Sequence, residues 1–283
     1  MNRPDWKINK DKPDIDLSGN VHYDKTLNDA ILNMNIGSIH DYPNEFELYQ
    51  SISNYYKVPL ENICIGFGST DVLSRIIQSL VFNHLYIVEP AFEMIEVYCQ
   101  LYNIKYTKIR FEDLKHISYS SNVYMANPNG NNGKVYDLSN YHFMTFIVDE
   151  AYSEFNKTYE AQYDSNTIVV KTLSKSLGLA GLRVGFCFAD KHIINILQNI
   201  RMNYIANSYA CKIVPVVIKE IPNVISRMQQ SKQYLQSKYD CVFSNGNYVL
   251  FKQPNKLTDR FGYKLTKESL YRMALTNIEL LDE

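Results

Sequence analysis

Short apolar runs that end in polar or glycine residues recur along the first two thirds of the chain. Residues 62–70 (NICIGFGST) pass from an apolar run into a glycine turn, and residues 72–80 then repeat apolar side chains at a helical spacing. Ser69, Thr70 and Asp71 are suitable N-cap and first-turn residues for that helix. The pattern therefore predicts a strand and a helix joined by a glycine-rich turn.

Five further apolar runs predict strands of the same kind. They are 84–90 (HLYIVEP), 122–128 (NVYMANP), 146–152 (FIVDEAY), 167–175 (TIVVKTLSK) and 184–190 (VGFCFAD). Runs that are apolar throughout suit strands buried on both faces, as in a parallel sheet covered by helices. Ligands of such α/β sheets bind beyond the carboxyl ends of the strands, which is where the polar and glycine residues of this chain gather.

The pattern changes after about residue 205. Residues 210–239 read as helices interrupted around Pro215 and Pro222, and residues 241–253 (CVFSNGNYVLFKQ) read as a hairpin-like pair of strands. This change predicts a second, smaller domain. The expected division is an N-terminal arm (1–35), a large domain (36–220) and a small C-terminal domain (221–283).

Composition narrows the class of protein. With 46% hydrophobic and 21% charged residues, the 283-residue chain has ordinary globular values. A net charge of -1 offers no electrostatic argument for a nucleic-acid or anionic-membrane partner. The first twenty residues lack the apolar segment of a signal peptide, and no apolar run approaches the ~20 residues of a membrane span. We therefore expect a cytoplasmic protein.

Cysteines give no sign of a disulfide framework or a metal site. Their number is odd and they are widely scattered, with no C-x-x-C pair. Free buried thiols and no bound metal are expected. The five are Cys64, Cys99, Cys187, Cys211 and Cys241.

Glycines are scarce, and seven of the eleven fall in three short loops. Three of these lie within residues 172–186 (TLSKSLGLAGLRVGF), after a lysine and on both sides of an arginine. A chain uses glycine where its backbone bends unusually or approaches another group closely. This stretch is therefore expected to pass close to a ligand.

Four stretches together resemble the fold-type I pyridoxal-phosphate (PLP) enzymes, the class I and II aminotransferases. Residues 172–186 match the T-L-S-K-x-x-G-L-A-G-L-R-x-G of the histidinol-phosphate aminotransferase and threonine-phosphate decarboxylase branch. Residues 148–155 (VDEAYSEF) match V-D-E-A-Y-x-E-F. Residues 66–73 (GFGSTDVL) resemble N-G-S-D-E-x-I, and residues 40–46 (HDYPNEF) resemble Y-P-D.

The resemblance runs from about Leu17 to the C-terminus and implies an aspartate aminotransferase-like fold. Such a fold has a mostly parallel central sheet flanked by helices, which agrees with the apolar runs described above. The small C-terminal α+β domain would be shortened, because only some sixty residues follow Pro222.

The resemblance also implies three catalytic side chains. Lys175 would hold PLP as a Schiff base and move a proton at the substrate alpha carbon, which needs an amine that can reach both positions. Asp149 would pair with the pyridinium nitrogen so that the ring can withdraw electrons. Tyr152 would bind the ring hydroxyl oxygen.

Further residues would hold the cofactor. Phe92 would lie on the ring face, with plain core packing as the alternative, and Tyr42 would reach the cofactor phosphate of a neighbouring subunit, with ordinary packing as the alternative. A trans contact of this kind implies a homodimer. A helix N-terminus and an arginine fork both suit a phosphate. The expected phosphate site comprises Gly68, Ser69, Thr70, Thr172, Ser174 and Arg183.

Glycines of residues 172–186 have separate expected tasks. Gly178 and Gly181 would let the loop fold back between the lysine and the arginine, and Gly185 would let the following strand pack closely.

Three segments depart from the family pattern. Residues 125–137 (MANPNGNNGKVYD) stand where the family has N-P-N-N-P-T-G, with Gly130 in the fourth position; Asn129, and after it Asn131, is the candidate for the ring hydroxyl. Residues 268–277 (ESLYRMALTN) resemble R-I-S/T-x-G but lack the glycine, and make Arg272 the candidate clamp for a substrate carboxylate or phosphate. Residues 17–23 (LSGNVHY) resemble a segment that lines the substrate pocket, without its usual Asn-Glu pair.

Three functions follow from the resemblance. The first is an aminotransferase that passes an amino group from glutamate to a small, phosphorylated oxo compound. The second is a decarboxylase of a phosphorylated amino acid such as threonine or serine phosphate, since the scaffold leaves the choice of alpha-carbon bond to the orientation of the substrate. The third is a binding protein that keeps the fold without catalysis, which the complete set of catalytic residues disfavours.

Overall fold

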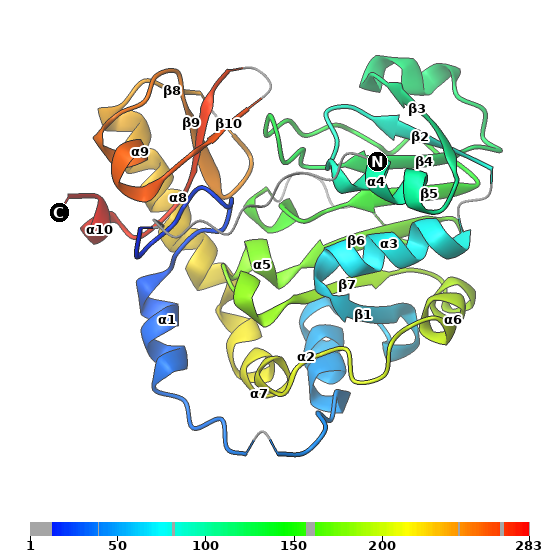
Figure 1. Ribbon diagram of the computed structural model, residues 1–283, viewed down its shortest axis with the longest axis horizontal. Coiled ribbons are helices and arrows are strands. Elements are labelled where there is room, and N and C mark those ends of the chain that lie inside the picture. The colour runs from blue at the N-terminus through cyan, green and yellow to red at the C-terminus, as the bar shows by residue number, and fades with distance from the viewer. Residues whose placement is uncertain are drawn as a thin grey trace.

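A seven-stranded sheet forms the centre of the molecule (Figure 1). The computed structural model describes residues 13–38, 40–80, 83–156, 162–242, 244–266 and 269–282. Within them the strands of this sheet are β1 (Ile63–Phe67), β2 (His84–Val88), β3 (Lys105–Ile109), β4 (Asn122–Ala126), β5 (Thr145–Asp149), β6 (Thr167–Thr172) and β7 (Val184–Phe188).

The strand order puts two predicted site residues, Asp149 and Thr172, at the same end of the central sheet. The order is β1-β7-β6-β5-β4-β2-β3, and the neighbours from β3 to β6 are parallel. β7 runs antiparallel to both β6 and β1. The carboxyl ends of the parallel strands β5 and β6 therefore lie side by side, beyond Asp149 and Thr172, as expected for a ligand site in an α/β sheet.

Helices cover both faces of this sheet (Figure 1). One buried cluster joins alternate strand residues such as Cys64 and Ile147 to α3, α4 and α6; a second joins Ile65 and Val148 to α2, α7 and α8. Side chains of a strand alternate between faces, so a strand that contributes to both clusters must be apolar throughout. The helices are α1 (Lys25–Leu32), α2 (Phe46–Tyr56), α3 (Gly68–Leu80), α4 (Met94–Leu101), α5 (Leu173–Ser176), α6 (Lys191–Asn199), α7 (Ser208–Val217), α8 (Ile221–Lys238), α9 (Lys256–Phe261) and α10 (Ile278–Asp282).

A second, antiparallel sheet lies beside α8 and α9 (Figure 1). Its order is β10 (Lys264–Leu265), β11 (Tyr271–Ala274), β9 (Tyr248–Phe251) and β8 (Cys241–Val242). The segment before α1 runs along this part of the chain. The N–H of Leu17 donates to the carbonyl of Phe261 at 2.8 Å, and that of Tyr23 donates to Leu275 at 2.9 Å. The beginning of the described chain is thus tied to its end.

The six strands predicted from apolar runs are all present, as are the helix after β1 and the β8–β9 pair. β3 has no counterpart among the predictions. It is an edge strand with exposed or half-exposed residues (KYTKI), so it lacks the apolar run that marks a buried strand. Pro222 stands in the first turn of α8, as proline prefers, but Pro215 lies inside α7.

Among the described residues, no helix is long and apolar enough to cross a membrane. The division into an arm and two domains stays a prediction, although the smaller sheet falls wholly within residues 221–283.

Candidate functional site

Lys175 lies in the short helix α5 directly after β6. Thr172 caps this helix, its hydroxyl accepting from the N–H of Ser174 at 3.2 Å. The Lys175 amine donates to the main-chain oxygen of Asn20 at 2.7 Å and lies 5.9 Å from the centre of the Tyr152 ring. Burial, followed by the nearby cations Arg272 and Arg183, lowers the pKa of this amine from 10.5 to about 7. A large fraction is therefore neutral, and nucleophilic, near neutral pH.

Asp149 ends β5 and is 7% exposed. Its carboxylate accepts from the Tyr124 hydroxyl at 3.0 Å and from the N–H of Ala151 at 3.1 Å. Burial raises the pKa of this carboxyl to about 6, although both hydrogen bonds and Lys175 lower it. A buried carboxylate is stabilised by a cationic partner, so the position suits a protonated ring nitrogen.

Tyr152 follows Asp149 by three residues, and its ring packs against Gly130, which has no side chain. A Cβ on Gly130 would come within 2.5 Å of the Tyr152 ring, so only glycine leaves room for the ring there. The Tyr152 hydroxyl accepts a hydrogen bond from the side-chain amide of Asn20. Burial raises the pKa of Tyr152 to about 12, and the hydroxyl therefore stays protonated and can donate to a ligand.

A buried ion pair braces the loop that carries Tyr152. Glu150 and Lys171, on the neighbouring strand β6, form an ion pair at 2.8 Å. The Lys171 amine also donates to the Ser153 hydroxyl at 2.7 Å. Because a buried charge is costly without its partner, these bonds hold the loop after β5 firmly against β6.

Gly68 and Arg183 meet at the N-terminus of α3. Gly68 has a φ of +76°, and a Cβ there would lie 2.3 Å from Nη2 of Arg183. A Cβ on Gly185 would lie 2.0 Å from the main-chain nitrogen of Ser69. Glycine at both positions therefore lets β7 and the arginine approach the first turn of α3, where free N–H groups favour an anion.

Ser174, in the short helix α5, has a buried hydroxyl. The residue is 6% exposed, and its hydroxyl has no hydrogen-bond partner among the described residues. Buried hydroxyls almost always have partners, so a buried hydroxyl without one, two residues after the end of β6, suits a ligand atom. The hydroxyl of Thr172, by contrast, donates to the carbonyl of Val184 at 3.0 Å.

Gly178 and Gly181, in the loop between Lys175 and Arg183, differ in how closely other residues pack against them. Gly178 has a φ of +71°, and a Cβ there would lie 2.5 Å from the carbonyl oxygen of His22, so this glycine lets the loop pass close to the N-terminal segment, a contact that the sequence did not predict. A Cβ on Gly181 would meet nothing within 4 Å, and nothing in the structure requires a glycine there.

Phe92 and the asparagine loop border the carboxylate. The backbone of Phe92 lies beside the Tyr124 hydroxyl that donates to Asp149, and Phe92 is half-buried. The side chain of Asn129 is bonded to the backbone. Its amide donates to the carbonyl of Pro90 at 2.5 Å, and its carbonyl oxygen accepts from the N–H of Asn131 at 2.9 Å. These bonds order the loop beside the site, and a contact of Asn129 with the ring hydroxyl stays a prediction.

Arg272 enters the site from β11 of the smaller sheet. One guanidinium nitrogen donates to the carbonyl of Gly130 at 2.6 Å, and the Nε atom is buried with no hydrogen-bond partner among the described residues. The guanidinium lies 5.5 Å from the centre of the Tyr248 ring. Its charge acts on both Lys175 and Tyr152, so the arginine is placed to bind an anionic substrate beside them.

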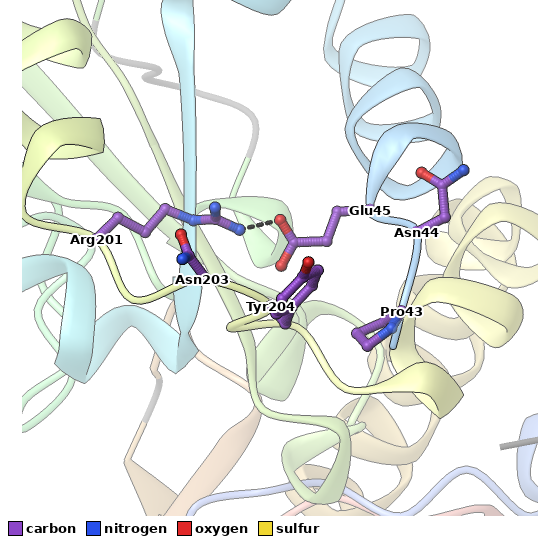
Figure 2. A pocket seen from close by; sticks show the side chains of 6 residues that line it. All are labelled: Pro43, Asn44, Glu45, Arg201, Asn203 and Tyr204. Atoms are coloured by element: carbon purple, nitrogen blue, oxygen red, sulfur yellow. Dashed lines mark hydrogen bonds and ion pairs between the residues drawn. The ribbon is translucent and has the colours of Figure 1, made fainter. Parts of the chain in front are cut away.

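Tyr42 is 79% exposed, and its described ring contact is a stack on Tyr204 at 4.5 Å. Figure 2 shows the pocket beside it, about 420 Å³ in volume, where Glu45 pairs with Arg201. Phe46 and Met202, which flank this pair in the sequence, are also exposed. Tyr42 thus stands on an open surface and is free to contact another molecule.

Two residues near the reactive groups escaped the sequence prediction. Tyr124 gives no motif, although a hydroxyl inside a wholly buried strand must find a partner and so offered a signal. Asn20 lies in the segment resembling a pocket lining, yet nothing local singles it out. Within the described ranges, no group of three or more His, Cys, Asp or Glu side chains is arranged to hold a metal ion.

The chain is similar to known proteins over most of its length. The family model described as aminotransferase class I and II matches residues 12–279. A histidinol-phosphate aminotransferase of Clostridium beijerinckii is 28% identical over 91% of this chain and 81% of its own length. Histidinol-phosphate aminotransferase 1 of Hydrogenovibrio crunogenus is 32% identical over 59% of this chain and 51% of its own length.

Solved structures share the fold. Histidinol-phosphate aminotransferase from Sinorhizobium meliloti, in complex with pyridoxal-5'-phosphate, superposes with a TM-score of 0.78 at 16% identity, covering 96% of this chain and 89% of that one. L-threonine-O-3-phosphate decarboxylase from Porphyromonas gingivalis superposes with a TM-score of 0.71 at 18% identity, covering 91% and 94%.

Proposed function

Because the chain belongs to the class I and II aminotransferases, which are PLP-dependent, we propose that it transfers the amino group of glutamate to a small phosphorylated oxo substrate. The observation that carries this proposal is the meeting of Lys175, Tyr152 and Arg272 within one buried site. The names of the relatives support a phosphorylated substrate.

The cofactor, when bound, supplies an aldehyde carbon and a ring that withdraws electrons from the substrate alpha carbon. Each side chain then has a task in the proposal. Lys175 would move the proton from the alpha carbon of the amino donor to the cofactor's aldehyde carbon, and in the second half-reaction would give a proton to the alpha carbon of the acceptor. Asp149 would keep a proton on the ring nitrogen. Tyr152 donates to the ring hydroxyl oxygen, and Phe92 lies against the ring face. The proposed phosphate site comprises Gly68, Ser69, Thr70, Thr172, Ser174 and Arg183.

Arg272 is the proposed clamp for the substrate anion. Its Nε atom lacks a partner among the described residues, and its planar fork suits a carboxylate or a phosphate equally well. The charges acting on Lys175 come mainly from Arg272 and Arg183, with Asp149 as the opposing carboxylate. Because Arg183 is proposed to bind the cofactor phosphate, Arg272 is left to bind an anionic group of the substrate.

The direct test offers PLP-loaded enzyme glutamate with a panel of phosphorylated and unphosphorylated 2-oxo acids and aldehydes, and separately O-phosphothreonine or O-phosphoserine. We expect 2-oxoglutarate to accumulate with at least one phosphorylated acceptor, and no carbon dioxide. Release of carbon dioxide from a phosphoamino acid, without 2-oxoglutarate in any arm, would replace the proposal with a decarboxylase. If the protein binds PLP but converts neither the oxo acceptors nor the phosphoamino acids, it is a binding protein that keeps the fold without catalysis.

We further propose that the active unit is a homodimer in which Tyr42 reaches the cofactor phosphate of the second copy. The exposure of Tyr42 and of the apolar side chains beside it supports this arrangement. Co-expression of differently tagged Tyr42→Ala and Lys175→Ala chains should restore activity at limiting PLP. Random assembly makes half of the dimers hybrid with one intact site each, so roughly a quarter of the wild-type activity is expected.

Each variant expressed alone is the control for this mixture and should be nearly inactive at the same PLP concentration. A mixture no more active than the sum of the two separate variants would show that Tyr42 serves the site of its own chain, or none.

A further inference from the structure

Asn20 lies between the two side chains proposed to act on the cofactor. Its main-chain oxygen accepts from the Lys175 amine at 2.7 Å, and its side-chain amide donates to the Tyr152 hydroxyl. Asn20 is itself 4% exposed. One residue of the N-terminal segment thus contacts both groups, although 132 positions separate it from Tyr152 in the sequence.

The position of Asn20 is tightly held. Its φ of +57° lies in the left-handed region, where asparagine is several-fold enriched over most other residues. The side-chain amide of Asn247 donates to the same main-chain oxygen at 3.2 Å. On either side, Leu17 and Tyr23 are bonded to the main chain of the C-terminal part. The amide of Asn20 is therefore presented to Tyr152 by a fixed backbone.

The neighbouring residues of the asparagine loop do not offer a side-chain amide to the Tyr152 hydroxyl. Gly130 has no side chain, and any added Cβ would strike the Tyr152 ring. The amides of Asn129 and Asn131 donate to the carbonyls of Pro90 and Ala91. Among the described residues, Asn20 supplies the amide hydrogen bond to the Tyr152 hydroxyl.

We propose that Asn20 is a positioning residue that orients the Tyr152 proton toward the cofactor ring oxygen. An amide nitrogen can only donate, so the Tyr152 hydroxyl accepts this bond and its own proton points elsewhere. The inference rests on the proposed role of Tyr152. The Oδ1 atom of Asn20 is buried with no partner among the described residues, as expected of a group at the edge of a ligand site.

The test uses the full-length chain and three variants: Asn20→Gly, Tyr152→Phe and the double variant. Asn20→Gly removes the amide but keeps the backbone carbonyl that binds Lys175 and allows the left-handed φ. Two quantities are measured: the dissociation constant of PLP, by equilibrium dialysis, and the pH midpoint of the bound cofactor's absorbance. The unfolding midpoint of each cofactor-free variant reports any structural damage.

Asn20→Gly is expected to raise the PLP dissociation constant about 3- to 10-fold, the effect of losing one hydrogen bond in a buried site. The absorbance midpoint should rise by about half a pH unit, because a less oriented Tyr152 leaves more negative charge on the ring oxygen to hold a proton on Lys175. In the Tyr152→Phe background the same substitution should change neither quantity further.

Asn20→Asp serves as the matched variant of equal size. A carboxylate accepts only, so it should capture the Tyr152 proton and raise the absorbance midpoint more than glycine does.

Equal effects of Asn20→Gly with and without the Tyr152 hydroxyl would overturn the inference and leave a purely structural role, and so would no effect at all. If Tyr152→Phe itself changes neither quantity, the proposed role of Tyr152 fails instead. The two failures are therefore distinguishable.

Discussion

Replacing Lys175 with alanine is expected to lower the transamination rate by at least about 10^4-fold and to abolish covalent attachment of PLP. The reason is the amine itself, whose pKa burial and two arginines lower to about 7. Such an amine is neutral often enough to bond an aldehyde carbon and is basic enough to move a proton. Borohydride reduction followed by peptide mass spectrometry should find PLP on the Lys175 peptide of the wild-type chain only.

Lys175→Arg is the matched control, because it keeps a cation of similar length. A guanidinium is never deprotonated in this pH range, so this variant should be as inactive as alanine. More than about 1% of the wild-type rate in Lys175→Arg would contradict the role proposed for the amine.

The pH dependence of PLP uptake has a definite sign. Below about pH 7 the Lys175 amine is mostly protonated and has no lone pair to offer. The rate of covalent uptake by the cofactor-free chain should therefore rise with pH, roughly tenfold per unit below 7, and level off above it. A rate still rising tenfold per unit between pH 8 and 10 would indicate an ordinary exposed lysine.

Replacing Asp149 with asparagine is expected to lower the rate about 10^2- to 10^4-fold even at saturating PLP. Asparagine keeps the size of the side chain but loses the negative charge that would hold a proton on the ring nitrogen. The carboxylate is buried at the end of β5 and bonded to the Tyr124 hydroxyl at 3.0 Å. Steady-state kinetics and the PLP dissociation constant, measured on the same preparation, separate turnover from binding.

Tyr124→Phe is the control for the surroundings of Asp149. It removes one hydrogen bond to the carboxylate and leaves the charge in place, so a loss of about tenfold or less is expected. A loss as large as that of Asp149→Asn would mean that the geometry of the loop, and not the charge of the carboxylate, limits the rate.

The sequence could predict a site because the candidate residues come in short, dense stretches. Lys175, Arg183 and the glycines between them lie within one loop, and Asp149 and Tyr152 lie within another. Each loop follows a strand apolar enough to be recognised. The sequence thus predicted that both loops lie at the carboxyl ends of strands, whereas the structure shows that these strands, β5 and β6, are neighbours.

Contacts between distant segments were not readable in the same way. The sequence around Tyr124 does not indicate that its hydroxyl faces Asp149, because this contact depends on the register of β4 against β5. Likewise β3 escaped prediction because an exposed edge strand carries polar residues.

The sequence by itself determined the fold class, the family and the cofactor, since buried strands and dense motifs are local features of the chain. Only the tertiary structure showed that β7 is antiparallel to its neighbours and that Arg272 reaches the site from the second sheet. It also showed that Asn20 hydrogen-bonds both Lys175 and Tyr152. The physical reason is that the contacts of Arg272 and Asn20, and the pairing of β7 with β1, join residues more than a hundred positions apart. A local sequence pattern indicates which side chains must be buried or paired. Which residues they pair with is decided by the packing of the folded chain.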